Sequence, residues 1–261
     1  MPIAKKDLVI AAGLVGIAAG AAWSFYKRQR KSTTASATET KAAVSKDRIA
    51  AKPLHPIEKI CKKRGIQSLY HFTKVSSLPS ILEHGLLSHQ AVKEMHWPLV
   101  DPYRHDGRED HICLSVSHPN SRMLYKLSHA DQSAWCILKF PITIAWERDC
   151  LFTPTNAANK EIQAMPEEEL RGDAAFERMF MQQSGSCTRS VSLASHYPTD
   201  VQAEVMCPGR ISPQRISAIY FYSRPNSELE KLAQERGLPA MPFRRLYQPR
   251  IGDKAQEVQC I

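Results

Sequence analysis

The chain has 261 residues, of which 43% are hydrophobic and 23% are charged, so it can form one large or two small globular domains with a sizeable core. Its 35 Lys and Arg against 26 Asp and Glu give a formal charge of +9, which favours a polyanionic partner such as nucleic acid or an anionic membrane surface. Seven cysteines and ten histidines are scattered without CxxC or zinc-ligand spacing. This pattern argues against a disulfide framework, calls for no metal, and predicts reduced, mostly buried thiols.

An apolar run without charges extends from Leu8 to Tyr26, close to the ~20 residues that a helix needs to cross a bilayer. A basic cluster follows it and is typical of a cytoplasmic flank. We therefore predict a transmembrane anchor over residues 1–31, with the rest of the chain on the cytoplasmic side. A cleaved signal peptide and a buried soluble helix are the two alternatives. The basic cluster consists of Lys27, Arg28, Arg30 and Lys31.

Residues 32–52 are rich in Ser, Thr, Ala and Lys and lack aromatic residues, a composition typical of a flexible linker. The folded domain is predicted over residues 53–261. No internal repeat is visible, and the strand-like segments are separated by unequal loops. This arrangement favours an α+β domain over a regular parallel α/β sheet.

The predicted elements of this domain follow from periodicity and from helix start and stop signals. One predicted helix ends at Gly65, and another contains Pro79 in its first turn and Gly85 at its C-cap. A loop is predicted between Ser88 and Asp110, where Pro, Asp, Gly and His accumulate. In chain order, we predict helices over 55–65, 77–87 and 228–236, and strands over 67–72, 111–116, 134–140, 204–206 and 216–222.

Generic catalytic motifs are absent from the sequence. It contains no GxGxxG, GxxxxGK[ST], HExxH or GxSxG. Dinucleotide-binding Rossmann folds, P-loop enzymes, zinc proteases and α/β-hydrolases therefore lose their usual sequence support.

Five other segments occur in a fixed order. They are SLYHFTKVSSLPSILEHGLLS at 68–88, DPYRHDG at 101–107, ICLSVSHPNSRMLYK at 112–126, TPTNAANKEI at 153–162 and YPTDVQAEV at 197–205. Together they resemble the DarT-like family of DNA ADP-ribosyltransferase toxins over roughly residues 67–222. The resemblance implies an α+β fold of the ADP-ribosyltransferase type: a split, antiparallel β-sandwich with flanking helices and with NAD in the cleft.

By this resemblance, Glu204 is the catalytic carboxylate. Cleavage of the bond between nicotinamide and ribose develops a cationic, oxocarbenium-like transition state, which a fixed carboxylate stabilises. A surface glutamate at a strand start is the alternative. Arg104 matches an arginine near the diphosphate and the acceptor base, and Arg108 is close enough to be the true equivalent.

The same resemblance implies two groups of binding residues. His71 would hold the NAD ribose, backbone groups beside Thr73 would meet the nicotinamide amide, and Ser115 and Ser117 would present hydroxyls from one face of a strand. The alternative is that the histidine is a locally paired core residue and that the serines are small residues packed on a sheet. Met123 and Tyr125 either line the cleft or belong to the core.

Asn156 and Asn159 match a loop that meets the acceptor strand. Their amides either hydrogen-bond base edges or stabilise a turn. Four basic residues of the same region could steer a nucleic acid or form a solvated face. They are Lys160, Arg171, Arg178 and Arg189.

These residues predict an NAD-dependent transfer of ADP-ribose onto a base of single-stranded DNA, because a base inside a duplex is poorly accessible. Transfer to protein or RNA is a second hypothesis, and a catalytically silent binding module is a third. The toxin resemblance also leaves room for an antitoxin partner.

Overall fold

The computed structural model describes residues 53–97 and 106–253, which belong to one compact unit of residues 52–261. The predicted anchor at 1–31, the linker at 32–52 and Arg104 lie outside the described residues. The domain limits derived from the sequence therefore stay a prediction.

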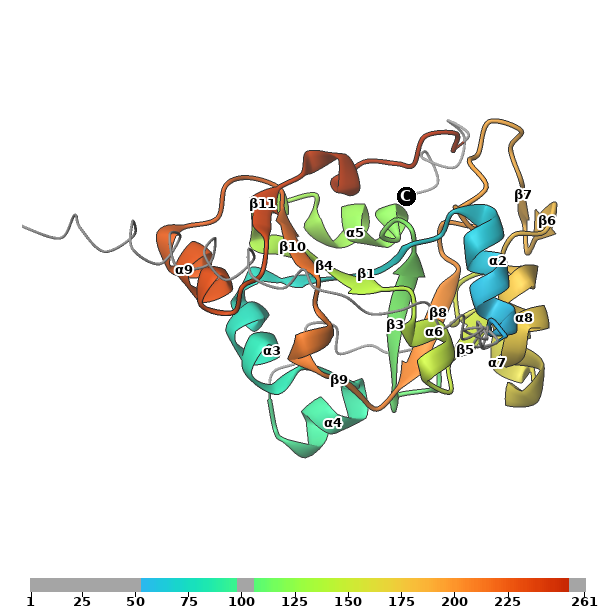
Figure 1. Ribbon diagram of the computed structural model, residues 1–261, viewed down its shortest axis with the longest axis horizontal. Coiled ribbons are helices and arrows are strands. Elements are labelled where there is room, and N and C mark those ends of the chain that lie inside the picture. The colour runs from blue at the N-terminus through green and yellow to red at the C-terminus, as the bar shows by residue number, and fades with distance from the viewer. Residues whose placement is uncertain (1–52, 98–105, 254–261) are drawn as a thin grey trace, which may run out of the picture. The chain divides into compact units, whose positions relative to one another are not determined.

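Short helices and strands alternate along the described chain (Figure 1). The α-helices are α2 Pro56–Arg64, α3 Leu78–His84, α4 His89–Glu94, α5 Ser121–Ser128, α6 Ile144–Glu147, α7 Lys160–Ala164, α8 Gly172–Arg178 and α9 Ser227–Glu235. The 3-10 helices are η1 Val75–Ser77, η2 Gln132–Ala134, η3 Glu167–Leu170, η4 Pro213–Arg215 and η5 Arg244–Tyr247. The strands are β1 Ser68–Lys74, β2 Leu86–Leu87, β3 His111–Val116, β4 Trp135–Pro141, β5 Leu151–Thr153, β6 Gln183–Ser184, β7 Cys187–Thr188, β8 Glu204–Pro208, β9 Arg210–Ile211, β10 Ala218–Phe221 and β11 Ala240–Pro242.

The main sheet has the strand order β11-β10-β4-β1-β3-β8-β5. β1 pairs with β4 along its whole length, whereas it pairs with β3 only at Leu69↔Val116 and Tyr70↔Ser115. The rest of β3 pairs with β8 instead. The sheet therefore consists of two halves that share a narrow junction, and Figure 1 shows β3 and β8 running across the direction of β1 and β4.

The predicted α+β class is confirmed: a central sheet carries helices on its flanks. One detail differs from the predicted antiparallel arrangement. β10 and β11 pair in parallel, because α9 lies between them in sequence and returns the chain to the end from which β10 began.

One face of both halves is covered by a single large hydrophobic cluster. Alternation along β4 places Cys136, Leu138 and Phe140 in this cluster, and all three are fully buried. Helices α2, α3, α8 and α9 contribute the covering side chains, including Ile57, Leu82, Phe176 and Ala233.

The opposite face is covered by two separate clusters, one on each half of the sheet. Trp135 and Ile137 of β4 pack with Leu124 of α5 and with η5. On the other half, Leu151 of β5 and Met206 of β8 pack against α7 and η3. Neither of these clusters includes Ser115 or Glu204, so these two polar side chains lie outside the apolar packing of this face.

Several predicted boundaries are confirmed by local chemistry. Gly65 ends α2 in a left-handed conformation with φ of 73°, and Pro79 lies in the first turn of α3. Gly85 ends α3 with φ of 87°, and a Cβ there would lie 2.4 Å from the carbonyl oxygen of Ile211. Only glycine fits this close approach of α3 to β9.

Helix α4 lies within the predicted loop at 88–110, and this part of the prediction is wrong. Its start is fixed by Ser88, whose Oγ accepts a hydrogen bond from the amide of Ala91. α4, α5, α7 and α8 have between five and eight residues. Helices this short show too little of the 3.6-residue period to be recognised by it.

The predicted membrane-anchored localisation is corrected. Within residues 53–97 and 106–253, no helix is both long enough and apolar enough to cross a membrane. The apolar run at 8–26, on which that prediction depended, lies outside the described residues.

No disulfide joins the cysteines of the described chain. The predicted burial is confirmed for all of these cysteines except Cys113. Burial raises the pKa of Cys136 to about 12, and burial with the nearby Glu58 carboxylate does the same for Cys61. These thiols therefore stay protonated at neutral pH. Cys260 lies outside the described residues.

Candidate active site

A row of polar side chains crosses the sheet where its two halves meet. Tyr70 of β1 lies opposite Ser115 of β3, and Glu204 of β8 lies opposite Thr153 of β5. The β3–β8 pairing ends at Leu114↔Val205. Ser115 is the next residue of β3 and Glu204 is the preceding residue of β8, so the two are adjacent in register. Directly opposed residues project from the same face, and the four therefore lie in one line.

Glu204 is held at the start of β8 by the loop that follows β5. The amide of Ala157 donates a hydrogen bond to Glu204 Oε2 at 3.1 Å. The side chain is half-buried. A half-buried carboxylate that a backbone amide orients can stabilise positive charge at one fixed position.

His71 spans the gap between the two halves of the sheet. It follows Tyr70, the last residue of β1 that pairs with β3, and its Nδ1 lies 2.9 Å from the carbonyl oxygen of Cys113. This contact fixes the imidazole ring in the split. Thr73, two residues further along β1, is buried and pairs with Cys136 of β4.

Tyr70 lies at the junction and remains protonated at neutral pH. Burial raises its pKa to about 12, with a smaller contribution from Tyr220. The phenol therefore keeps its proton for hydrogen bonding beside Ser115.

The two serines predicted on one strand have different surroundings. Ser115 is buried, and its Oγ accepts a hydrogen bond from the amide of Asn120 at 3.1 Å. Ser117 lies beyond the end of β3 and adopts φ of 61°. The expected shared strand face is therefore wrong, because the left-handed turn at Ser117 ends the alternation. A non-glycine residue in this conformation is uncommon and occurs often at functional sites.

Both predicted acceptor-binding asparagines stabilise local turns. Asn156 Oδ1 accepts from the amide of Ala158, and Asn159 Oδ1 accepts from the amide of Glu161 as the N-cap of α7. Their loop contains Ala157, the residue that binds Glu204. They are thus near the candidate catalytic carboxylate, and each side-chain NH₂ group remains available as a donor beyond these bonds.

Arg104 lies outside the described residues. Arg108, the other arginine predicted for this role, lies within them and has a largely buried side chain. Arg108 Nε lies 3.8 Å from Glu167, and Nη2 donates to the carbonyl oxygen of Met165 at 3.5 Å. The nearby Asp106 accepts from the Arg108 amide. These contacts tie Arg108 to η3 and the loop before it.

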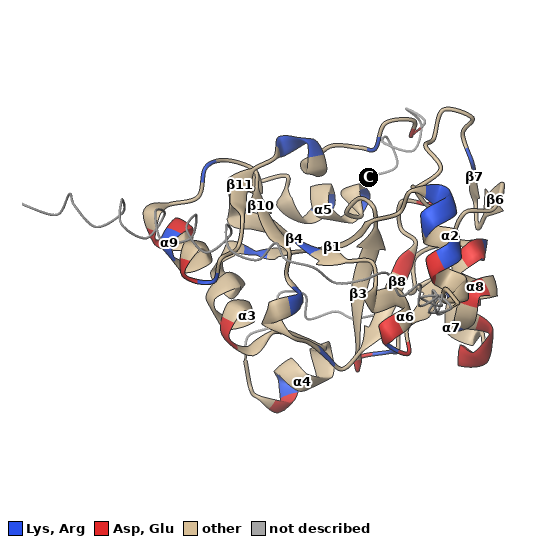
Figure 2. Ribbon diagram, viewed as in Figure 1, with Lys and Arg blue, Asp and Glu red and all other residues tan. Residues whose placement is uncertain are grey.

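Three of the four basic residues predicted to steer nucleic acid are bound by protein acceptors. Arg171 pairs with Asp149 and Glu167, and Arg189 donates to backbone carbonyl groups. Arg178 donates to the carbonyl oxygen of Glu169. Figure 2 shows acidic residues gathered around α7 and α8, so this side is not a uniformly basic surface.

Met123 and Tyr125 differ in exposure. Tyr125 on α5 is 47% exposed, so core packing does not account for it. Met123 is half-buried, and its amide donates to Asn120, the N-cap of the same helix.

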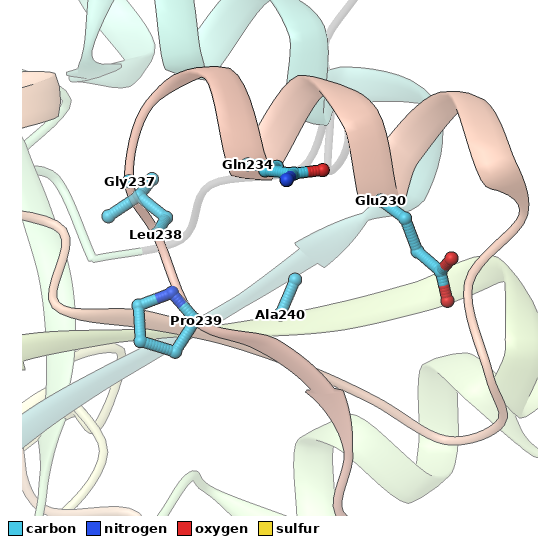
Figure 3. A pocket seen from close by; sticks show the side chains of 6 residues that line it. All are labelled: Glu230, Gln234, Gly237, Leu238, Pro239 and Ala240. Carbon is cyan, nitrogen blue, oxygen red and sulfur yellow. The ribbon is translucent and has the colours of Figure 1, made fainter. Parts of the chain in front are cut away.

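A hollow of about 400 Å³ lies elsewhere, between α9 and β11. Figure 3 shows Glu230 and Gln234 extending from α9 above Pro239 and Ala240. β11 is at one end of the strand order, and β8 with Glu204 is near the other end. The hollow is therefore separate from the polar row. In the described ranges, no group of three or more His, Cys, Asp or Glu side chains could hold a metal.

Two residues of the site were not singled out from the sequence. Thr155 Oγ1 donates to Asp200 Oδ2 at 2.6 Å, which links the loop after β5 to the segment before β8. Asp200 is 2% exposed. Its position four residues before Glu204 was the signal available, but a buried acid cannot be recognised from one sequence.

An α+β sheet split between two strands, a histidine across the split and a carboxylate on the neighbouring half together match the class of site expected of an ADP-ribosyltransferase. A family model described as "ssDNA thymidine ADP-ribosyltransferase, DarT" matches residues 70–243, more than half of the chain. The chain belongs to this family. The membership confirms the family that the ordered segments predicted.

Individual relatives have low sequence identity to this chain. A DNA ADP-ribosyl transferase-DNA ADP-ribosyl glycohydrolase fusion protein of Thermosipho africanus is 24% identical over 197 residues, which cover 67% of this chain and 48% of that protein. The chain thus spans about half the length of this relative.

Two solved structures are similar as well. Thermosipho africanus DarTG in complex with ADP-ribose matches with a TM-score of 0.51 and 22% identity, over 69% of this chain and 51% of that one, which shows a shared fold. Thermus sp. 2.9 DarT in complex with NAD+ matches with a TM-score of 0.45 and 18% identity, over 69% of this chain and 97% of that one.

Proposed function

We propose that this protein transfers ADP-ribose from NAD to a thymidine base of single-stranded DNA and releases nicotinamide. The observation that carries the proposal is the placement of Glu204, which the Ala157 amide orients at the junction of the two sheet halves. The description of the matching family supports the acceptor.

Glu204 is proposed to stabilise the charge that develops during transfer. The bond between the nicotinamide nitrogen and ribose C1′ breaks, and its electron pair leaves with nicotinamide, which departs as a neutral molecule. The ribose becomes cationic, and the fixed carboxylate lowers the energy of this state more than that of the ground state. A thymine ring nitrogen then forms the new bond to C1′ and releases one proton.

NAD is proposed to bind in the split between the halves, which would make the fold a split β-sandwich of the ADP-ribosyltransferase type. His71 is positioned to hold the ribose, because its ring is fixed in the split by the Cys113 carbonyl. Thr73 and Ser115 would contribute backbone and hydroxyl groups nearby. Ser117, held in a left-handed turn, would present its hydroxyl from the loop after β3.

Arg104 is proposed as the arginine that meets the acceptor. The support comes from Arg108, whose side chain is only 10% exposed and faces Glu167 and Met165, so it is less accessible to a substrate that must enter and leave. Asn156 and Asn159 are proposed to contact the DNA through their NH₂ groups, since their oxygens serve turns.

Single-stranded DNA is favoured because a base must leave the stack before its ring nitrogen can be attacked. The formal charge of +9 suits a polyanionic acceptor. The relative that combines a transferase with a DNA ADP-ribosyl glycohydrolase supports a further proposal, that a glycohydrolase reversing this modification serves as antitoxin.

The test incubates the full chain with labelled NAD and separate pools of single-stranded DNA, RNA and protein. Label is expected in DNA that contains thymidine and not in DNA that lacks it. Glu204→Gln is expected to lower the rate by about 10²- to 10³-fold. The exposed Glu228→Gln serves as the matched control and is expected to retain the wild-type rate.

Two outcomes would contradict these assignments. Label that appears only in protein or only in RNA would make the acceptor wrong. Transfer by Glu204→Gln at the rate of the control would remove Glu204 from the chemistry.

A further inference from the structure

The segment that leads to Glu204 is held by two arginine side chains through its backbone. Arg189 donates to the carbonyl oxygens of Ala194 and Tyr197, both at 2.8 Å. Arg250 donates to the carbonyl oxygens of Pro198 at 2.7 Å and Thr199 at 3.5 Å. Guanidinium groups thus fix successive carbonyls of a loop that has no regular structure.

Arg250 belongs to the C-terminal segment, which Figure 1 shows passing above α5 toward this loop. Its side chain is 1% exposed and pairs with Asp253, which is 7% exposed, at 2.7 Å. The guanidinium also lies 5.6 Å from the ring of Tyr197. A buried ion pair is retained only when its remaining hydrogen bonds are made, and the carbonyls of Pro198 and Thr199 satisfy this need.

The same segment continues into Asp200, whose carboxylate connects it to a second loop. Asp200 Oδ1 accepts from the amide of Gln202 at 2.8 Å, and Oδ2 accepts from Thr155 Oγ1 at 2.6 Å. The carbonyl oxygen of Thr155 accepts from Thr153 Oγ1 at 2.8 Å. Thr155 is thereby fixed at both its side chain and its backbone.

Two residues after Thr155, the amide of Ala157 donates to Glu204 Oε2. An unbroken path of hydrogen bonds and short backbone steps therefore runs from Arg250 through Asp200 and Thr155 to Glu204. The bonds of this path are buried at Arg250 and partly buried at Asp200, Thr155 and Glu204. Reduced access of water strengthens such bonds and restricts the groups they join.

We propose that Thr155, Asp200 and Arg250 are positioning residues that set the orientation of the Glu204 carboxylate. The proposal rests on the proposed function of Glu204. Arg250 lies beyond residues 70–243, which match the family model, so the proposal extends the candidate site into the C-terminal segment. None of the three needs to touch NAD or DNA to act in this way.

Thr155 provides the sharpest test, because Thr155→Val removes the hydroxyl with little change in shape, and Thr155→Ser retains it. For Thr155→Val we expect kcat to fall about 10- to 100-fold, since displacing a catalytic group by about 1 Å costs up to about 10²-fold. The KM for NAD should stay within about twofold. Thr155→Ser should recover most of kcat.

A second readout does not depend on activity. Hydrogen exchange of the Ala157 amide, followed by NMR, should be faster in Thr155→Val than in wild type and normal in Thr155→Ser. The matched control is Thr188→Val, which removes an exposed hydroxyl on β7 and should change neither readout.

Arg250→Lys tests the far end of the path. Lysine keeps the positive charge beside Asp253, but a single ammonium cannot reproduce the guanidinium fork to the two carbonyls. We expect a severalfold lower kcat, an unchanged KM for NAD and faster exchange at Ala157. Wild-type values for all three would remove Arg250 from the path.

The proposal is overturned if Thr155→Val has wild-type kcat and wild-type exchange at Ala157. It is also overturned if Thr155→Val and Thr155→Ser lose activity equally, since the hydroxyl then has no role. Failure of the proposed function is a separate result: the wild type would label no DNA, and exchange at Ala157 would still decide whether this path orients Glu204.

Discussion

Both halves of the sheet are stabilised by apolar clusters, but only one of them also has a network of polar contacts around its loops. The half formed by β1, β4, β10 and β11 has apolar clusters on both faces, and alternating residues of β4 contribute to each. The half formed by β3, β8 and β5 also has apolar clusters on both faces, and hydrogen bonds such as Thr155–Asp200 additionally hold the long loops around its polar end. Apolar packing does not depend on the direction of the groups in contact, whereas a hydrogen bond fixes the orientation of its donor and acceptor. The first half is suited to give stability and the second to place Glu204.

Removing a large side chain from the half formed by β1, β4, β10 and β11 is expected to have the largest effect on stability. Phe140 on β4 is fully buried in the cluster shared by both halves. Phe140→Ala should lower the free energy of unfolding by about 3–5 kcal/mol through lost burial and a cavity. Urea denaturation measures this change. A loss below about 1 kcal/mol would contradict the role of apolar packing in stabilising the sheet.

The loop side should give the protein its sensitivity to acid. His118 follows β3 and contacts Tyr197, and its pKa is lowered to about 4, mainly by burial, with Arg250 opposing its charge and Asp253 favouring it. The unfolded chain binds this proton near pH 6.5, and the folded chain does so only near pH 4.

Stability should therefore be unaffected by His118 above pH 6.5 and should fall as pH decreases from 6.5 to 4. The loss from this group should reach about 3 kcal/mol. His118→Gln should remove this part of the pH dependence of the free energy of unfolding, measured by urea denaturation at several pH values. A His118→Gln protein with the same slope as wild type would show that other groups cause it.

Helix N-caps offer a smaller, paired comparison. Asn159 caps α7 beside the candidate site, and Asn226 caps α9 on the other half. Replacing either by Ala should cost about 1 kcal/mol of stability, measured by thermal unfolding. Only Asn159→Ala should also lower transfer to DNA. Equal activity of the two variants would leave Asn159 with capping alone.

The sequence predicted the strands better than the short helices. Alternating or continuous apolar residues identified β3, β4, β8 and β10, and glycine and proline marked the ends of α2 and α3. Helix α4 was missed, because its cap, Ser88, is a single residue among many similar ones. The ordered segments also identified the family, since residues such as His71 and Glu204 stand within recognisable motifs.

Partners in space could not be predicted in the same way. The sequence indicated a basic surface that includes Arg171 and Arg178, but it did not show that both are bound by acidic residues or carbonyl groups. It also placed Ser115 and Ser117 on one strand, and the left-handed turn at Ser117 separates them. Both outcomes depend on which residues meet when the chain folds.

The sequence by itself determined the family and the α+β class and predicted the catalytic carboxylate, because these depend on residue types in a fixed order. Only the tertiary structure decided that the sheet divides between β1 and β3, that Ala157 orients Glu204, and that Arg250 holds the segment leading to it. The physical reason is that a hydrogen bond requires two groups within about 3 Å, and residues 52 positions apart reach this distance only after the chain has folded.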